Sequence, residues 1–404
     1  MSGRLACDLV VPGVGAAVRV AECRVFAKVL QAAMPGWPFR VVEADGSTPP
    51  VQLAGRAGGY RLVSPAFPDG LLLESPVEAA CCVIADLVEI FLDQHPGRVG
   101  LHCASVEMNG RLVLFPECHR SGKSLLTAAL AGAGLRIVGD DVLVLEDGGE
   151  GMALGTAPRL RLPLPESLDV ALHTYTAAYA GPEDDRYRYL ALPPGQLAEY
   201  GERVPLGAMV LLERDEHLTR PELTLLAPGD GLTRLLRQHF AHDLSSDALM
   251  ARFLPLMQSL PCRLLRYSEP LEAARCLVDL LPGVMDGPRR KAGDVGTDQR
   301  GAERGVDGVH RPVGVHDRWR ATTEVREYAL EDERFLIHQP SGAIHRLNAT
   351  GQLVWGLLRS EPMTAAEIIE LLVDHFDDVP AERIDRDVRV LLGDILAARL
   401  IFRV

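Results

Sequence analysis

The stretch Phe115-Pro-Glu-Cys-His-Arg-Ser-Gly-Lys-Ser124 decides the fold that this chain is expected to adopt. It ends in Gly-Lys-Ser, the last part of the phosphate-loop pattern G-x-x-x-x-G-K-[ST]. A short apolar, strand-like segment, 112–115, precedes the loop, and a helix-like run, 124–130, follows it. This order brings backbone N–H groups and a helix N-terminus to one phosphate, and with the alternating strands and helices further on it predicts an α/β (or α+β) core.

The residues of the loop predict a site for ATP and Mg²⁺. Lys123 is expected to reach the outer phosphates, and the Ser124 hydroxyl is expected to bind the metal. One residue departs from the pattern, because Glu117 stands where the pattern has Gly, and its carboxylate would repel a phosphate unless it turns away. The predicted nucleotide-binding set is Arg120, Ser121, Gly122, Lys123, Ser124 and Leu125.

Two consecutive acids follow the loop helix. Asp140 and Asp141 stand between the strand-like segments 135–139 and 142–145. A strand that ends in Asp beside a phosphate loop commonly forms the second half of a metal–nucleotide site. A polar turn between two strands is the alternative, but the order and the distance from the loop favour the nucleotide site.

The loop, the acid pair and the run Val99-Gly-Leu-His102-Cys-Ala-Ser-Val resemble the HPr serine kinase/phosphorylase family, and most closely its branch from gene clusters for modified peptides. The resemblance covers roughly residues 95–280 and implies a P-loop kinase core. It implies that Asp140 takes the proton from the acceptor hydroxyl, that His102 lies near the reacting phosphate and that Lys123 completes the catalytic set.

The same resemblance implies the metal-binding residues. They are Ser124, Asp141 and, by its spacing from Ala157-Pro158, Glu166. Ser167-Leu168 stand where the family has Arg-Gly, so a solvated turn acid is the alternative for Glu166. The resembled kinases are commonly hexamers, which makes a homo-oligomer compatible with the resemblance.

Charge and composition limit the location and the partners. The chain has 404 residues and a formal net charge of −13, which disfavours nonspecific binding to nucleic acid or to an anionic membrane. Its 8 cysteines form no C-x-x-C pair, so neither a zinc site nor a disulfide framework is indicated. No signal peptide is evident, and acids interrupt the longest apolar run, near 79–92. A cytoplasmic protein is expected.

The expected domains follow changes in composition. Residues 1–95 form a mixed segment that covers the kinase core and flanks the acceptor, with a helix over 21–34 that places Val25, Val29 and Ala32 on one face. Residues 96–283 form the core. The charged, Gly-rich segment 284–318 cannot bury enough apolar area to order itself and is expected to be a linker.

Residues 319–404 are expected to form a separate winged-helix-like α+β domain. Two short strands around the turn Gln339-Pro-Ser-Gly342 indicate a hairpin. Asn348 is expected to cap a first helix, Thr364 and Glu367 form a capping box for a second, and a third begins near Pro380.

The order Ser341-Gly-Ala-Ile, Leu347-Asn-Ala-Thr-Gly and Val354-Trp-Gly-Leu-Leu in this domain resembles the PqqD family of peptide chaperones. The resemblance implies that the leader of a ribosomally made precursor peptide adds as a strand to a sheet edge and rests against the third helix. The DNA-binding alternative for a winged helix is disfavoured, because acids offset the arginines of that helix. The edge implied is Ala343, Ile344, His345, Arg346 and Leu347.

Together these features predict an ATP-dependent Ser/Thr kinase that phosphorylates a precursor peptide held through its leader by the PqqD-like domain. Two alternatives stay open. One is an inactive kinase fold that serves as a scaffold or chaperone, which Glu117 favours. The other is a kinase for a carrier protein or a small hydroxyl compound.

Overall fold

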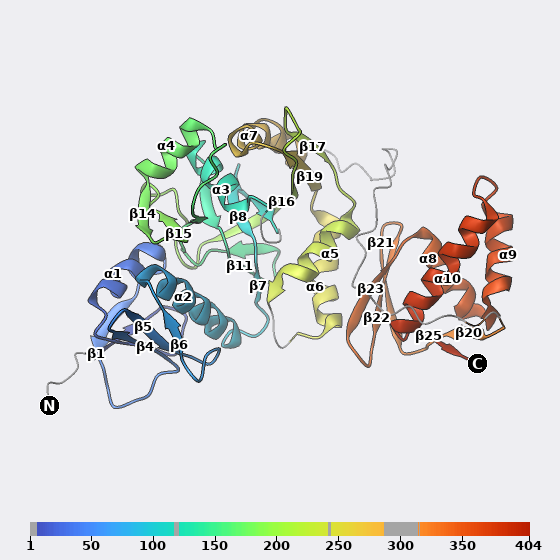
Figure 1. Cartoon of the computed structure of the whole chain (residues 1–404), viewed down its shortest axis with the longest axis horizontal. Coiled ribbons are helices and arrows are strands. Elements are labelled where there is room, and N and C mark those ends of the chain that lie inside the picture. The colour runs from blue at the N-terminus through green and yellow to red at the C-terminus, as the bar shows by residue number, and fades with distance from the viewer. Residues whose placement is uncertain (1–5, 117–120, 241–243, 287–313, 315) are drawn as a thin grey trace. The chain divides into compact units, whose positions relative to one another are not determined.

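The structure is a computed structural model that describes residues 6–116, 121–240, 244–286, 314 and 316–404 (Figure 1). The chain forms two compact units. The first comprises residues 1–243 and 259–292, and the second comprises residues 244–258 and 293–404. Most of the expected linker, 284–318, lies outside the described residues. The mixed α/β character expected from the sequence is confirmed.

The first unit begins with a six-stranded sheet of order β3-β1-β2-β4-β5-β6, in which only β2 and β4 pair in parallel. Two helices pack with it around one apolar core (Figure 1). The elements are β1 (Ala6–Val10), β2 (Val18–Ala21), α1 (Arg24–Ala33), β3 (Arg40–Glu43), β4 (Val51–Arg56), β5 (Gly59–Val63), β6 (Leu71–Leu73) and α2 (Pro76–Asp93).

The expected inner face of α1 is wrong by one position. Its buried residues are Phe26, Leu30 and Ala33, whereas Val25 is 61% exposed. Both stripes have helical spacing, but Phe26 and Leu30 bury more apolar area than the set that contains Val25, so the helix turns that stripe inward.

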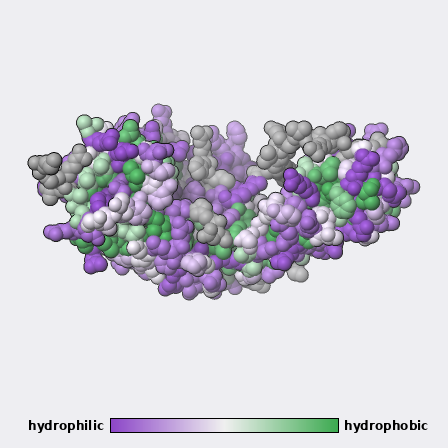
Figure 2. All heavy atoms as spheres, turned by 90° about the horizontal axis from the view of Figure 1, so that it is seen from below, coloured by the Kyte–Doolittle hydropathy of each residue, from purple (hydrophilic) through white to green (hydrophobic). Residues whose placement is uncertain are grey.

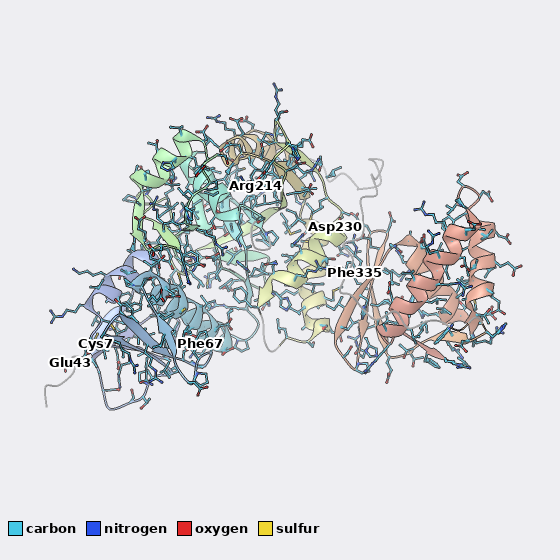
Figure 3. All side chains as sticks on the ribbon, in the orientation of Figure 1. Cys7, Glu43, Phe67, Arg214, Asp230 and Phe335 are labelled. Atoms are coloured by element: carbon cyan, nitrogen blue, oxygen red, sulfur yellow. The ribbon has the colours of Figure 1, made fainter. Side chains whose placement is uncertain are left out.

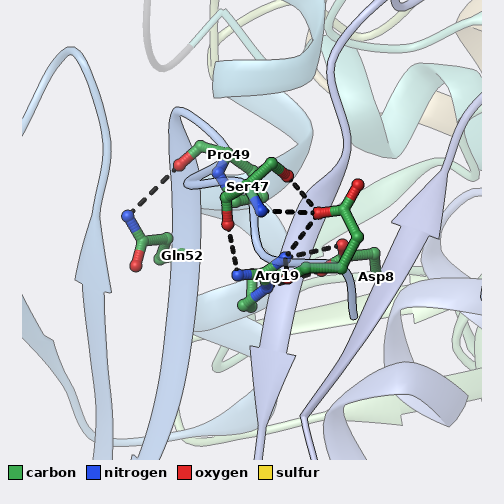
Figure 4. Close-up of polar contacts among 6 residues, drawn as sticks. Asp8, Arg19, Ser47, Pro49 and Gln52 are labelled. Carbon is green, nitrogen blue, oxygen red and sulfur yellow. Dashed lines mark hydrogen bonds and ion pairs between the residues drawn. The ribbon is translucent and has the colours of Figure 1, made fainter. Parts of the chain in front are cut away.

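An ion pair ties the loop after β3 to this sheet (Figure 4). Arg19 donates through Nε and Nη2 to the two oxygens of Asp8, at 2.8 Å each, and Asp8 is only 4% exposed. Arg19 also donates to the carbonyl of Ser47 at 2.6 Å. The hydroxyl and backbone N–H of Ser47 lower the pKa of Asp45, which fixes the turn of this loop.

The second part of the first unit carries a ten-stranded mixed sheet. The order β10-β8-β9-β16-β12-β11-β7-β18 is extended by β19, which pairs with β16 and β17. The strands are β7 (Val99–Leu101), β8 (Ala104–Met108), β9 (Arg111–Phe115), β10 (Arg136–Gly139), β11 (Leu143–Leu145), β12 (Glu150–Met152), β16 (Arg203–Arg214), β17 (Glu222–Leu225), β18 (His239–Phe240) and β19 (Cys262–Tyr267). β16 runs parallel to both β9 and β19.

Helices and a small sheet pack around this sheet and position the site. The helix after β9 is α3 (Lys123–Gly132), which packs against α7 (Pro270–Asp286). The expected strand–loop–helix order and the acids between β10 and β11 are therefore confirmed. The remaining elements are β13 (Arg159–Arg161), α4 (Val170–Ala178), β14 (Ala180–Glu183), β15 (Tyr187–Leu190) and α5 (Pro228–Gln238).

The second unit has two three-stranded sheets, ordered β24-β20-β25 and β21-β22-β23. Its elements are α6 (Ser246–Ser259), β20 (Arg318–Ala321), β21 (Val325–Leu330), β22 (Glu333–His338), β23 (Ala343–Leu347), α8 (Ala349–Ser360), β24 (Met363–Thr364), α9 (Ala365–His375), α10 (Ala381–Ala397) and β25 (Ile401–Arg403). Both expected caps are confirmed: Asn348 accepts from the N–H of Gly351, and Thr364 forms a full capping box with Glu367. The hairpin and the three helices are confirmed as well.

The helix α6 belongs to this unit although its sequence lies between β18 and β19 of the first. Asp247 on α6 accepts from the hydroxyl of Tyr328 at 2.7 Å and pairs with Arg326 at 3.3 Å. In the register of the sheet, Tyr328 stands opposite Phe335, which is 1% exposed and is labelled in Figure 3. The N-terminal turn of α6 therefore lies on the face of β21-β22-β23 that Phe335 occupies.

Candidate functional site

The N-terminus of α3 has the backbone of an anion-binding site. Its N-cap is Gly122, at φ +84° and without a side-chain cap hydrogen bond among the described residues, and the first amides of a helix have no partner within the helix itself. Lys123 begins the helix and is 9% exposed. The hydroxyl of Tyr267, at the end of β19, donates to the carbonyl of Ser121 at 2.9 Å and fixes the last turn of the loop. This geometry favours a bound phosphate.

Asp140 lies buried behind this helix. Its side chain is 1% exposed, and its Oδ2 accepts from the backbone N–H of Arg159 at 3.0 Å. Burial and the charge of Asp141 raise the pKa of the Asp140 carboxyl, and the nearby charge of Lys123 opposes that effect. The position suits a carboxyl whose charge is compensated by a cation.

Asp141 is more accessible than Asp140, with a side chain that is 36% exposed. Its Oδ2 pairs with Arg159 at 2.9 Å, and its Oδ1 lies 3.7 Å from Nε2 of His102. Burial alone would raise the pKa of Asp141, but the neighbouring His102 and the charges of Arg159 and Lys123 hold it below its ordinary range. Asp141 is therefore an ionised hydrogen-bond acceptor at neutral pH.

A cavity of about 380 Å³ lies over the N-terminus of α3. Four basic side chains line it, together with His102 and Asp141. The guanidinium of Arg159 stacks on Tyr187, 4.6 Å from the ring centroid. Arg214, which is labelled in Figure 3, brings a buried Nε that has no hydrogen-bond partner among the described residues. Such a cationic, amide-rich cavity attracts a polyanion. The basic residues are Lys123, Arg159, Arg161 and Arg214.

Most of the predicted nucleotide-site residues meet at this cavity. Ser121, Gly122, Lys123, Ser124 and Leu125 all line it. Two residues of the predicted loop, Glu117 and Arg120, lie outside the described residues. Glu117 is the residue that departs from the loop pattern.

The cavity also differs from the predicted set. Asp140 does not line it, and Glu166 stands exposed in a turn with no place in the lining, although Pro163 and Pro165 beside it take part. The basic residues Arg159, Arg161 and Arg214 were missed by sequence reasoning. The alternation Arg-Leu-Arg at 159–161 was a usable signal, because it puts both arginines on one face of a strand.

The loop and the buried acid carry oxygens of the kind that magnesium prefers. Within the described residues, no three His, Cys, Asp or Glu side chains gather into a group that could hold a metal alone. Magnesium needs only one or two protein oxygens when phosphates supply others. Asp140 Oδ1 and Ser121 Oγ are both buried and have no partner among the described residues, so the loop and the acid each leave one oxygen unsatisfied.

In the second unit, the predicted peptide-binding residues form β23. Among the described residues, β23 is an edge strand of the sheet β21-β22-β23. Ala343, His345 and Leu347 share the face of Leu336, whereas Ile344 and Arg346 take the opposite face. Burial, and then the neighbouring His338, lower the pKa of His345. Alternate residues of an edge strand direct their backbone groups outward, where a further strand can pair. The third helix, α10, packs mainly against α9.

The comparisons with known proteins bear on this second unit. Residues 333–401 match the family model described as Coenzyme PQQ synthesis protein D (PqqD). A solved structure entitled "TbiB1 in Complex with the TbiA(beta) Leader Peptide" is similar at 24% identity, over 20% of this chain and 93% of that chain, with a TM-score of 0.19. No curated protein matches the chain. The chain thus contains a PqqD-like domain, as expected.

Hydrophilic side chains surround scattered hydrophobic ones on the face shown in Figure 2. No helix in the described part of the chain is long and apolar enough to cross a bilayer.

Proposed function

We propose that this chain is a kinase that transfers the γ-phosphoryl group of ATP to a Ser or Thr hydroxyl of a ribosomally made precursor peptide. The PqqD-like domain would hold the leader of that peptide. One observation carries the kinase assignment: the N-terminus of α3, four basic side chains and an ionised carboxylate converge on a single cavity. The resemblance of the loop and the acid pair to the HPr kinase family points to the same chemistry.

The basic residues of the cavity would contact different parts of the nucleotide. Lys123 and the amides of α3 would hold the outer phosphates, and Arg159, Arg161 and Arg214 would neutralise the remaining charge. Mg²⁺ would be held by the Ser124 hydroxyl and by Asp140, in place of the Asp141 and Glu166 that the family resemblance gave, and when bound it would neutralise charge on the phosphates. The buried, unpaired Oδ1 of Asp140 supports that assignment.

Access favours Asp141 as the proton acceptor, although the family resemblance gave that role to Asp140 and the lowered pKa of Asp141 makes it the weaker base. Asp141 is 36% exposed at its side chain and lines the cavity, whereas Asp140 is 1% exposed and does not. In the transfer, the hydroxyl oxygen of the peptide attacks the γ-phosphorus, and the bond from that phosphorus to the ADP oxygen breaks. The hydroxyl proton passes to the Asp141 carboxylate, which His102 and Arg159 orient.

The test is an incubation of the full-length protein with ATP, Mg²⁺ and the precursor peptide encoded beside its gene, followed by mass mapping of the peptide. The expected product carries one phosphate, and Asp141→Asn should lose about 10²–10⁴ in rate for loss of the proton acceptor. Lys123→Ala should lose nucleotide binding and transfer together, while far-UV circular dichroism stays unchanged. Nucleotide binding without transfer to any peptide would support a scaffold instead, and absence of nucleotide binding would remove the kinase proposal.

The leader-binding part of the proposal is supported by the family match at 333–401 and by the edge position of β23. A leader that pairs with β23 gains backbone hydrogen bonds, and the side chains beside the strand select its sequence. Linking two binding modules raises the local concentration of the acceptor to about the millimolar range. A kinase site with weak affinity for the acceptor can then still act on one residue of the held peptide.

A further inference from the structure

A second cavity of the first unit, of about 360 Å³, adjoins the phosphate cavity. Its walls come from α2, from the segment around Val142, from residues 156–159, and from β15 and β18. The lining is mostly apolar, and its apolar members are Ile84, Ala85, Val88, Val142, Ala157 and Phe240. The proposed nucleotide chemistry leaves this space without a role.

The two cavities share three residues, which are His102, Asp141 and Arg159. Lys123, Arg161 and Arg214 line only the phosphate cavity, so Arg159 is the single basic residue in the described lining of the second one. The triphosphate therefore belongs to the first cavity, and the second suits an uncharged group. One carboxylate, Asp141, reaches both spaces.

We propose that this second cavity is the acceptor pocket, which binds a peptide segment whose Ser or Thr hydroxyl stands next to an apolar residue. The proposal rests on the proposed kinase function and names the class of its substrate. The hydroxyl would lie against Asp141 and His102 at the junction, and the neighbouring apolar side chain would pack against Ile84, Val88 and Phe240. The volume is at the lower end of the usual range of ligand pockets, about 300–1,000 Å³, which suits an extended segment.

A nucleobase is the other apolar group that such a site could accept. The base of ATP lies at the α-phosphate end, away from the γ-phosphorus that reacts. The second cavity adjoins the carboxylate that receives the proton, so it lies at the reacting end of the nucleotide. That position favours the acceptor over the base.

The helix α2 supplies half of the apolar lining residues, so the N-terminal 95 residues have a part in choosing the substrate. Cys81, Ile84, Ala85, Val88 and Glu89 lie on successive turns of that helix and line the cavity. The Sγ of Cys81 forms a hydrogen bond with the hydroxyl of Tyr189, at 3.2 Å, and this contact positions Cys81 in the wall of the pocket.

The decisive variant is Ala85→Phe. Ala85 is exposed and outside the core, so a larger side chain fills the mouth of the pocket without disturbing the packing of α2. The matched control is Ala177→Phe, at an exposed helical alanine that lines neither cavity. Ala85→Phe should raise the KM for the precursor at least about tenfold and leave the Kd for an ATP analogue within about twofold, whereas the control changes neither.

The result that overturns the pocket is a loss of nucleotide affinity in Ala85→Phe with an unchanged KM for the peptide, which would assign the cavity to the base. An unchanged KM together with unchanged nucleotide affinity overturns it as well. Replacing the apolar neighbour of the mapped acceptor by Asp should reproduce the rise in KM with the unmodified enzyme.

A second measurement works without catalysis. Cys81 lines the pocket, whereas Cys276, which is also partly exposed, does not. The precursor should protect Cys81 from iodoacetamide, measured by peptide mass mapping, and leave Cys276 unprotected. Protection without phosphorylation would keep the pocket and refute the kinase, and phosphorylation without protection would refute the pocket.

Discussion

The phosphate loop is held by a contact that a single methyl group would break. Gly122 has a φ of +84°, a conformation that costs any other L-residue about 1–2 kcal/mol. A Cβ at this position would lie 2.5 Å from the hydroxyl oxygen of Tyr267, closer than real Cβ contacts come. Tyr267 is fully buried, so the loop would have to move, and the hydrogen bond to the carbonyl of Ser121 would be lost.

The variant Gly122→Ala therefore carries two costs that can be separated. Tyr267→Phe removes the clashing oxygen and leaves the ring carbon Cζ at 3.6 Å from the new Cβ, an ordinary contact. By itself Tyr267→Phe removes one hydrogen bond, worth about 0.5–1.5 kcal/mol. In that background Gly122→Ala should cost only the backbone term, about 1–2 kcal/mol of folding stability.

In the unmodified protein Gly122→Ala should cost clearly more, and the two substitutions should couple by about 1 kcal/mol or more. The assay is a double-mutant cycle on the Kd of a fluorescent ATP analogue and on the Tm without nucleotide. Gly110→Ala is the matched control, because Gly110 has a φ of +71° and nothing within 4 Å of its Cβ position. It should lower the Tm slightly and leave the Kd unchanged. Additive costs in the cycle would refute the proposed contact between the loop and Tyr267.

Two further outcomes test the two sites separately. Arg214→Ala should weaken binding of the ATP analogue by about 10- to 150-fold, the worth of a hydrogen bond to a charged group, whereas the exposed Arg220→Ala should not, and equal effects in a titration would remove Arg214 from the site. Ile344→Pro should abolish binding of a labelled leader in fluorescence anisotropy, because Pro disturbs the ladder of β23, while Ile344→Ala keeps the N–H and most of the affinity. Unimpaired leader binding by Ile344→Pro would place the leader elsewhere.

Local features of the sequence predicted local structure well. The Asn348 cap and the Thr364–Glu367 box need residues only three positions apart, and both formed as expected. The strand–loop–helix order and the position of the acid pair follow from the spacing of a few residues, and they too agree with the structure.

Features that depend on contacts distant in sequence could not be predicted. Arg159 and Arg214 line the same cavity only because the start of β13 and the end of β16 lie beside it, and nothing near either residue in sequence signals a phosphate. The exposure of Val25 depends on which stripe of α1 the sheet accepts. The place of α6 in the second unit depends on Asp247 and its partners on β21, some 80 residues away. In each case tertiary packing chose between locally equivalent options.

The two acids should give opposite dependences of stability on pH. The pKa of Asp140 is raised in the folded state, so as pH rises above the unfolded value of about 4 the unfolded chain releases this proton first, and stability falls. The pKa of Asp141 is lowered in the folded state, so its contribution to stability is present above the unfolded pKa and is lost as pH falls through the folded pKa.

Without nucleotide and Mg²⁺, Asp140→Asn should therefore raise the Tm at pH 7, with a difference that vanishes towards pH 4. Asp141→Asn should lower the Tm at pH 7, because it leaves Arg159 without its carboxylate, and this difference should also shrink on acidification. Thermal scans of the three proteins across this range decide the matter. A Tm difference for Asp140→Asn that is negative, or independent of pH, would mean that the buried carboxyl ionises without cost, and Asp140 would then lose its assignment as the acid that awaits a cation.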